Sequence, residues 1–485
     1  MRCLSDRVGP VVLMLALFFV AAVPIAAQSG DDWVLGNWKG TLMAGSQELQ
    51  ILYHITRGDD GTLTGTMDVP TQGAIGMPLS TVVVDGQTVT MTFPVPGGGT
   101  YEGTLTESGE DIVGTFSQGP ASFPMELSRS AEESVLLVRP QEPKPPFPYL
   151  TREVTFPNRE AGIELAGTLT LPEGAGPFPA VVLVSGSGPQ DRNETLLGHK
   201  PFLVLADHLA RNGVAALRFD DRGVGESTGD FAAATSEDFA TDALAAVAYL
   251  REQPEVGRGR VGIVGHSEGG LIAPMAANRS DDVAFIIMLA GPGVPGIDIL
   301  VAQGVLINRV GGASEHIIEL NTRIQTGLAD IVAAEPDPDV ADPLMRSFMR
   351  ELIDMLPDDV REAAGAALSD ETIDQTVKQL NSPWFRFFLH YDPRPVLEHV
   401  EVPVLALFGG KDLQVPAELN VPEIEYAFAR AGNDDATVRT LPGLNHLFQE
   451  ADTGSPAEYA QIEQTLSPVL LDAVSTWILE RFGPS

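Results

Sequence analysis

Two regions of the chain differ in the periodicity of their apolar residues. Between residues 31 and 130, apolar and polar positions alternate in short runs, and turn signals such as Asp85-Gly86 separate the runs. Alternation with a period of two is typical of strands that bury one face. This pattern predicts a small all-β domain of seven or eight antiparallel strands, arranged as a barrel or a sandwich.

Beyond residue 150 the apolar runs become continuous and alternate with helical stretches, which is typical of a doubly wound α/β sheet. The segments 151–158 and 163–171 are predicted to form an antiparallel pair, and the remaining strands are predicted to be mostly parallel and buried. These remaining strands are 180–185, 214–220, 261–265, 283–291, 402–410 and 436–443. The predicted helices are 201–212, 237–252, 267–278, 417–431 and 456–481.

One long segment interrupts this alternation. Residues 294–395 contain amphipathic helical stretches but no clear strand. An insertion at this point lies over the carboxyl ends of the strands, where open α/β sheets bind their ligands. We therefore predict an α/β domain made of residues 151–293 and 396–485, with a helical cap formed by residues 294–395.

The segment between the two predicted domains is rich in proline. Residues 131–150 end in RPQEPKPPFPYL, and prolines restrict the backbone to extended conformations. We predict a stiff extended linker here.

The first residues resemble an export signal. Two arginines precede an apolar stretch from Val8 to Val23, and small residues follow it. This order predicts a signal peptide of residues 1–27 and an exported, periplasmic or extracellular protein. An uncleaved membrane anchor is the alternative, and no later segment is long and apolar enough to span a bilayer. Cleavage removes Cys3, the only cysteine, so disulfides and thiol catalysis are not expected.

The charge balance limits the partners of the protein. The formal net charge of −36 makes the surface repel phosphate backbones and anionic membranes. We therefore expect no nucleic-acid partner. No pair of histidines has a ligand spacing such as H-E-x-x-H, so no metal site is predicted.

The sequence GHSEGG contains the strongest chemical signal. Ser267 follows a predicted buried strand and precedes a predicted helix, and Gly265 and Gly269 flank it with the G-x-S-x-G spacing of a nucleophile elbow. Small residues are needed there because the serine backbone is strained and the strand and helix pack closely. This context favours a nucleophilic serine over a plain tight turn.

A nucleophilic serine needs a base and an acid that orients the base. The elbow fold predicts the chain order serine, acid, histidine. Asp412 follows a predicted strand and a Gly-Gly turn, and His446 follows the last predicted strand. Because the carboxyl ends of parallel strands lie at one edge of the sheet, we predict Ser267, Asp412 and His446 as a catalytic triad.

An oxyanion hole requires two backbone N–H groups near the nucleophile. The residue after the nucleophile, Glu268, is predicted to supply one of them. Ser187 is predicted to supply the other, because it follows a buried strand and lies between Gly186 and Gly188, which allow close approach to a ligand.

The region from residue 150 to the end resembles the α/β-hydrolase superfamily, and within it the capped bacterial carboxylesterases that are similar to dienelactone hydrolase. The matching motifs are GSGPQDRNE, LRFDDRGVGESTGDF, GHSEGG, SPWFRFFLHYDP, GGKDLQVP and LNHLF. This resemblance implies Ser267 as nucleophile, His446 as base and Asp412 as its orienting acid, with an acyl-enzyme and no cofactor.

The resemblance also has departures. Ser185 stands where lipases often begin the oxyanion loop with His-Gly, and dienelactone hydrolases proper use a cysteine nucleophile, so their substrate does not transfer. A small-molecule ester with a short or medium acyl chain is expected. In the first domain, Gly36 and Trp38 resemble the first strand of lipocalin-like barrels.

The cap is expected to select the substrate. His266 beside the nucleophile and aromatic residues near the end of the cap are candidates for lining a substrate pocket, although aromatic residues at such spacing also form helix cores. The aromatic candidates are Trp384, Phe385, Phe388 and Tyr391.

Other functions are also compatible with these sequence features. The same triad can serve a peptidase, an aminopeptidase or an acyltransferase, and Glu351 or Asp354 in the cap is a candidate to recognise an amino terminus. A non-catalytic protein that binds ligands through the β domain is a further alternative. A dinucleotide site at the glycine-rich RGVGESTG is disfavoured, because the next predicted helix begins too late. The sequence predicts no oligomeric state.

Overall fold

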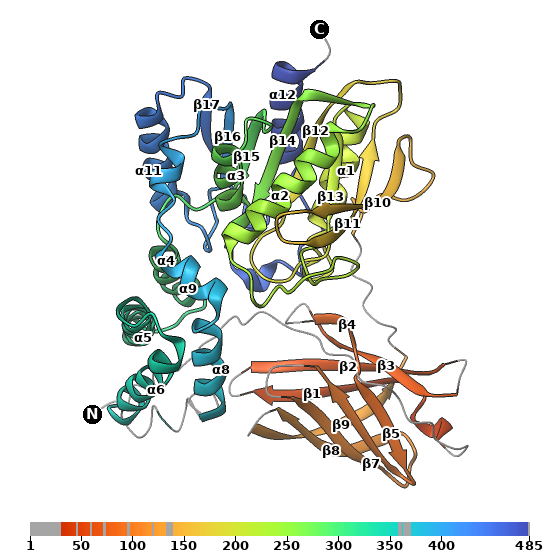
Figure 1. The fold of residues 1–485 in the computed structure, drawn as a ribbon. Helices are drawn as coiled ribbons and strands as arrows, with labels where there is room; N and C mark the ends of the chain where they lie inside the picture. The colour runs from red at the N-terminus through yellow and green to blue at the C-terminus, as the bar shows by residue number, and fades with distance from the viewer. Residues whose placement is uncertain are drawn as a thin grey trace.

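The structure is a computed structural model that describes residues 31–44, 47–58, 61–70, 74–94, 98–118, 121–131, 139–356, 361 and 370–483. The predicted signal peptide, residues 1–27, lies outside the described residues. The chain forms an antiparallel β-sheet domain, followed by an α/β domain with a helical insertion (Figure 1). No helix among the described residues is long and apolar enough to cross a membrane.

The first domain is one antiparallel sheet, in which neighbouring strands follow one another in sequence except where β1 pairs with β9. The nine strands have the order β4-β3-β2-β1-β9-β8-β7-β6-β5. Their bounds are Gly36–Ala44 (β1), Gln47–Arg57 (β2), Leu63–Val69 (β3), Ala74–Pro78 (β4), Thr81–Asp85 (β5), Thr88–Phe93 (β6), Gly99–Leu105 (β7), Asp111–Gln118 (β8) and Ala121–Ser130 (β9), and the short 3₁₀ helix Asp32–Val34 precedes them.

This sheet curls around a single core. Strands β3 and β5, which come from opposite ends of the sheet, contact each other. The enclosed side chains include Trp38, Tyr53 and Tyr101, all fully buried. The antiparallel all-β domain is therefore confirmed, and its single sheet favours the barrel over the sandwich. Strand β4 was not predicted, because its sequence AIGMP contains a glycine and a proline, which weaken the strand signal.

The α/β domain contains an eight-stranded sheet with the order β10-β11-β13-β12-β14-β15-β16-β17. The first two strands are an antiparallel pair, and β13 to β17 run parallel to β12, as predicted. The bounds are Leu150–Asn158 (β10), Ile163–Leu171 (β11), Phe178–Val184 (β12), Ala215–Phe219 (β13), Val256–His266 (β14), Phe285–Leu289 (β15), Val404–Gly409 (β16) and Ala436–Leu441 (β17).

Helices pack on both faces of this sheet. Helices α1 (Pro201–Arg211) and α12 (Pro468–Phe482) pack together, while α2 (Ser236–Arg251) packs on α3 (Glu268–Arg279), with α11 (Ala417–Ala431) against β16 and β17. The predicted helix 456–481 was placed too early. Ser467 caps α12 and Pro468 occupies its first turn, so the helix begins there, and only the short 3₁₀ helix Pro456–Glu458 precedes it.

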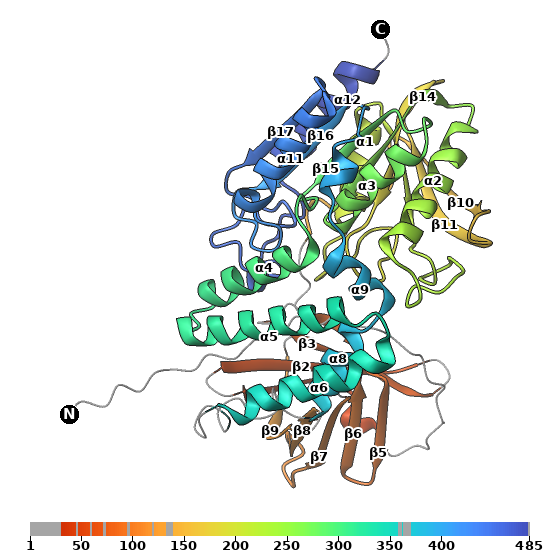
Figure 2. The same cartoon turned by 60° about the vertical axis from the view of Figure 1, so that its left-hand side comes forward.

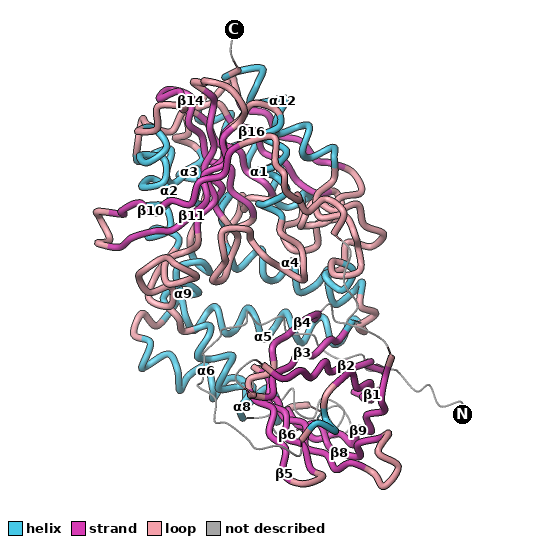
Figure 3. The backbone as a smooth tube through the Cα atoms, turned by 90° about the vertical axis from the view of Figure 1, so that its right-hand side faces the viewer, coloured by secondary structure: helices cyan, strands magenta, loops and turns pink. Residues whose placement is uncertain are grey.

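The insertion is helical. It leaves the sheet after β15 and returns before β16, and its bounds are Gly296–Val310 (α4), Glu315–Ala334 (α5), Pro338–Asp354 (α6), Asp370–Leu380 (α8), Pro383–His390 (α9) and Arg394–Leu397 (α10). Figures 2 and 3 show α4, α5 and α9 between the α/β sheet and the β-sheet domain. Side chains of α5, α6, α8 and α9 form a separate small core, so the insertion is a packed unit of its own.

The described part of the proline-rich segment lies against the α/β domain. The buried Arg139 guanidinium donates to the main-chain carbonyls of Leu197, Ala460 and Ile462. The side-chain amide of Gln141 donates to the carbonyl oxygen of Leu466 and accepts the backbone N–H of the same residue. Prolines predict an extended backbone here, but the side chains between them attach the segment to the loop before α12.

Candidate active site

The predicted elbow is present as a sharp strand-to-helix turn. Strand β14 ends at His266 and α3 begins at Glu268, so Ser267 alone connects them, with a φ of 53° and a ψ of −116°. A Cβ atom on Gly265 would lie 1.9 Å from the carbonyl oxygen of Gly269, and one on Gly269 would lie 2.1 Å from the carbonyl oxygen of Val184. Glycine is therefore required at both flanking positions, and the strained serine is held by close packing.

The structure brings His446 and Asp412 together near the same edge of the sheet. Asp412 follows β16 and His446 follows β17, and the distance from His446 Nδ1 to Asp412 Oδ2 is 2.8 Å. The two residues are only 5% and 4% exposed. The other carboxylate oxygen of Asp412 accepts the backbone N–H groups of Gln414 and Val415, each at 2.8 Å. These bonds fix the carboxylate as an acceptor, so Nδ1 of His446 donates to it, and in the neutral ring Nε2 is the acceptor nitrogen.

Ser267 is partly exposed, and His266, its neighbour in sequence, contacts the backbone carbonyl of His446. The rings of His266 and His446 have centroids 4.9 Å apart. Within the described residues, the Ser267 hydroxyl makes no hydrogen bond to His446. Such bonds are often loose in enzymes before substrate binds.

The predicted oxyanion loop also reaches Ser267. A Cβ atom on Gly186 would lie 3.2 Å from Cβ of Ser267, so the backbone after β12 passes directly beside the serine. The Ser187 side chain is a hydrogen-bond partner of the Glu268 carboxyl group. The loop is thus fastened to the first residue of α3, and the predicted roles of the two amides stay predictions.

The carboxyl group of Glu268 joins the elbow to the cap. It is 2% exposed, and its Oε1 accepts Ser236 Oγ at 2.6 Å and Trp384 Nε1 at 2.7 Å. Burial raises the pKa of Glu268, and the hydrogen bonds from Ser236, Trp384 and Ser187 only partly offset this shift. A cap residue, Trp384, therefore binds the side chain of the residue that follows Ser267.

The other aromatic candidates pack partly within the cap and partly, in the case of Tyr391, against the core of the α/β domain. Phe388 stacks on Trp384 with centroids 5.1 Å apart and is 7% exposed. Phe385 packs against the cap core and Tyr391 stacks on Phe387. Burial raises the pKa of Tyr391. Trp384 is the aromatic candidate that the hydrogen bonds connect to the elbow, and the pocket roles of all four remain predictions.

Both ring nitrogens of His266, which was also predicted to line the pocket, contact other groups of the protein. His266 is 7% exposed, its Nδ1 lies 2.8 Å from Glu194 Oε1, and its Nε2 lies 3.0 Å from the carbonyl oxygen of His446. Sequence reasoning missed Glu194. Its position within GSGPQDRNE was the available signal, but no spacing rule connects that motif to His266.

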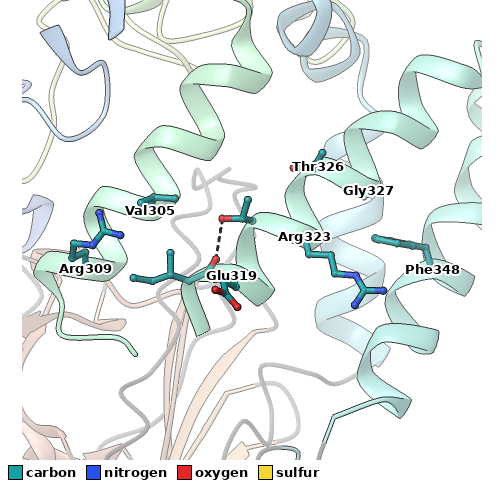
Figure 4. A pocket seen from close by; sticks show the side chains of 9 residues that line it. Val305, Arg309, Glu319, Arg323, Thr326, Gly327 and Phe348 are labelled. Carbon is teal, nitrogen blue, oxygen red and sulfur yellow. Dashed lines mark hydrogen bonds between the residues drawn. The ribbon is translucent and has the colours of Figure 1, made fainter. Parts of the chain in front are cut away.

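A separate hollow lies in the cap rather than at the elbow. An open groove of about 600 Å³ runs between α4, α5 and α6 and is shown in Figure 4. It is lined by Val305, Arg309, Ile318, Glu319, Thr322, Arg323, Thr326, Gly327 and Phe348, none of which is a predicted site residue. In the described part of the chain, no group of three or more His, Cys, Asp or Glu side chains is arranged to hold a metal ion.

The sequence of the α/β domain and its cap matches a known protein family. The α/β-hydrolase family profile matches residues 181–462, which are more than half of the chain. The chain therefore belongs to the α/β-hydrolase family, and the fold and family predicted from GHSEGG and its companion motifs are confirmed.

Individual proteins match this chain at low sequence identity or over only part of its length. The chain is 28% identical to the esterase EstD of Thermotoga maritima over 320 residues, which cover 65% of this chain and 66% of EstD. It is 37% identical to an uncharacterised protein of Pseudomonas aeruginosa over 117 residues, 24% of this chain and 29% of that protein. Among solved structures, an esterase of Pyrococcus furiosus matches with a TM-score of 0.42 and 15% identity, covering 69% of this chain and 92% of that one.

Proposed function

We propose that this protein is an exported serine carboxylesterase that hydrolyses small esters with short or medium acyl chains. The observation that carries the proposal is the buried His446–Asp412 bond of 2.8 Å beside a serine held at a φ of 53° on an elbow. The similarity to the esterase EstD supports an ester as substrate. Export rests on the apolar segment that follows the amino terminus.

In the proposed reaction, Ser267 Oγ attacks the ester carbonyl carbon while His446 Nε2 removes the hydroxyl proton. Asp412 holds Nδ1–H and stabilises the imidazolium that forms. The backbone N–H groups of Glu268 and Ser187 bind the oxyanion, and loss of one such donor typically lowers the rate ~10²–10³-fold. His446 then protonates the leaving alcohol, and water attacks the acyl-enzyme with the same histidine as base.

The test is a substrate series. Hydrolysis of p-nitrophenyl esters from acetate to palmitate is measured for the mature chain, for Ser267→Ala and for the control Ser122→Ala, an exposed serine of the β-sheet domain. An aminoacyl p-nitroanilide is assayed in parallel. Cleavage of short esters that disappears only in Ser267→Ala is the expected result. Activity that survives in Ser267→Ala contradicts the nucleophile, and activity on the anilide alone contradicts the ester.

A further inference from the structure

A second histidine–carboxylate pair lies next to the predicted triad. Glu194 and His266 are 4% and 7% exposed and are joined by a 2.8 Å contact between Oε1 and Nδ1. Glu194 belongs to the loop after β12, and His266 is the last residue of β14. The proposed ester-hydrolysis mechanism gives this pair no task, although burying a carboxylate and an imidazole together is costly unless they are paired.

The contacts of His266 determine its protonation. Nδ1 faces a carboxylate oxygen, and Nε2 faces the backbone carbonyl oxygen of His446 at 3.0 Å. A backbone carbonyl can only accept a hydrogen bond. A neutral imidazole has one N–H and one acceptor nitrogen, so it cannot donate to two acceptors, whereas an imidazolium can.

One oxygen of the carboxylate is equally committed as an acceptor, while the other, Oε2, is buried without a hydrogen-bond partner among the described residues. Oε1 of Glu194, the atom that faces His266, also accepts the backbone N–H of Gly186 at 2.8 Å. This one oxygen atom therefore accepts two N–H groups. One is the backbone N–H of Gly186, in the loop beside Ser267, and the other is the ring Nδ1–H of His266, the residue that precedes Ser267. Glu194 reaches this position from a backbone with a φ of 53°, which is costly for a glutamate and indicates that the loop is held in place.

We propose that His266 is a buried imidazolium, neutralised by Glu194, that positions the triad by holding the backbone carbonyl of His446. This role rests on the proposed ester-hydrolase function. Through one carboxylate oxygen and one ring, the pair joins the oxyanion loop, the nucleophile strand and the loop of the triad histidine. His266 and Glu194 are positioning residues, because neither is placed against the reacting atoms.

The groups around His266 agree with this charge state. Glu194 faces it from the loop after β12, Asp412 from the loop after β16, and His446 and Phe448 from the loop after β17, with ring centroids 4.9 and 6.3 Å away. Burial by itself lowers the pKa of His266. The charge and hydrogen bond of Glu194, the carbonyl of His446 and the charge of Asp412 outweigh burial, and the net shift is upward.

Glutamine cannot replace Glu194 in this arrangement. An amide oxygen at the Oε1 position accepts from Gly186 and from Nδ1–H, but it supplies no negative charge to hold the imidazolium, so the bond from Nε2 to the carbonyl of His446 is lost. An amide NH₂ at that position meets the N–H of Gly186 as a second donor. Either orientation breaks one of the three bonds.

The first experiment observes the protons directly and does not depend on activity. The full mature protein is labelled with ¹⁵N-histidine, and the ring signals of His266 are assigned by their loss in His266→Gln. We expect both ring nitrogens of His266 to carry protons at neutral pH. An unprotonated nitrogen at either position overturns the proposal, whatever the outcome of the ester assay.

The second experiment separates positioning from plain stability. Glu194→Gln and His266→Gln are expected to lower kcat by about 10²-fold, the effect of misplacing a catalytic group by about 1 Å, while KM stays near the wild-type value. The matched control is His54→Gln, which removes a contact between a partly buried histidine and a buried aspartate in the β-sheet domain. Wild-type kcat in folded Glu194→Gln overturns the positioning role.

The pH dependence of stability provides a third readout, which also applies if kcat cannot be measured. A histidine whose pKa is raised on folding stabilises the protein fully below its unfolded pKa of about 6.5, and this stabilisation is lost as pH rises through its folded pKa. The melting temperature of the wild type relative to His266→Gln should therefore fall as pH rises above about 6.5. A difference that is constant or grows with pH contradicts the imidazolium.

Discussion

In each of the two domains, a histidine contacts a buried aspartate. In the α/β domain, His446 Nδ1 lies 2.8 Å from Asp412, and in the β-sheet domain His54 Nε2 lies 2.9 Å from Asp68, which is completely buried. The two distances are almost equal and both aspartates are buried, although the His54 side chain is 12% exposed and the His446 side chain 7%. What differs is the place in the fold to which each pair belongs.

The His54 pair lies within the sheet. His54 on β2 is level with Asn37 on β1, whose side-chain oxygen lies 3.0 Å from Nδ1, and Asp68 is on β3. The contacts thus join neighbouring strands. An amide side chain can be turned so that its NH₂ group faces Nδ1, and a neutral His54 then satisfies both neighbours. The His446 pair instead lies on loops beyond the strand ends, beside a strained serine. A catalytic site therefore needs a histidine–aspartate pair and also a position at the strand ends, next to a reactive side chain.

The largest difference in kcat between the two pairs is expected for the matched replacements Asp412→Asn and Asp68→Asn. Asp412→Asn should lower kcat by about 10⁴-fold, because the amide no longer stabilises the imidazolium or the correct tautomer of His446. Asp68→Asn should leave kcat unchanged. Steady-state hydrolysis of a p-nitrophenyl ester measures both, and equal losses in the two variants would remove the distinction between the domains.

The next effect concerns the segment that connects the domains. Arg139→Ala leaves three main-chain carbonyls without their shared donor, so the free energy of unfolding should fall by about 3 kcal/mol. Burial lowers the pKa of Arg139, and the charge of Glu463 only partly offsets this shift. Urea denaturation measures the change against the exposed control Lys144→Ala. Equal stability of the two variants would mean that the segment is only a tether.

A smaller effect is expected where the cap meets the elbow. Trp384→Phe removes the donor to Glu268 and keeps most of the stacking on Phe388, so kcat/KM should fall about tenfold, equivalent to ~1.4 kcal/mol. The control is Trp33→Phe, since the Trp33 indole donates to the carbonyl of Gly86 within the β-sheet domain. A loss of the same size in Trp33→Phe would show that the assay reports general destabilisation.

The smallest effect on activity is expected for His54→Gln. Its contacts are internal to the β sheet, so kcat and KM for the ester should match the wild type, while the melting temperature decreases because a buried carboxylate loses a partner. Ester kinetics and thermal unfolding together measure this. A large fall in kcat without loss of folded protein would give the β-sheet domain a part in the reaction.

The sequence predicted the α/β domain well because its signals are local. Buried parallel strands are continuous apolar runs, and the serine, the aspartate and the histidine each follow such a run in the order that the elbow fold requires. Strand β4 and the start of α12 were missed because short strands and helix boundaries depend on packing and capping, as Ser467 shows.

The contacts around the site could not be predicted in the same way. Glu194 meets His266 across 72 positions of sequence, and Trp384 meets Glu268 across 116. No periodicity records such contacts, because they arise only when loops from different strands meet at one edge of the sheet. The docking of Arg139 on residues more than 300 positions away was hidden for the same reason.

The central claim, that Ser267 is the nucleophile of an esterase, is tested most directly by covalent labelling. The mature protein is incubated with diethyl p-nitrophenyl phosphate, and its intact mass and labelled peptide are determined. We predict the addition of one diethylphosphoryl group per chain on Ser267, loss of ester hydrolysis in proportion, and no addition to Ser267→Ala. Labelling of another residue, or an unlabelled chain that still hydrolyses esters, would contradict the account.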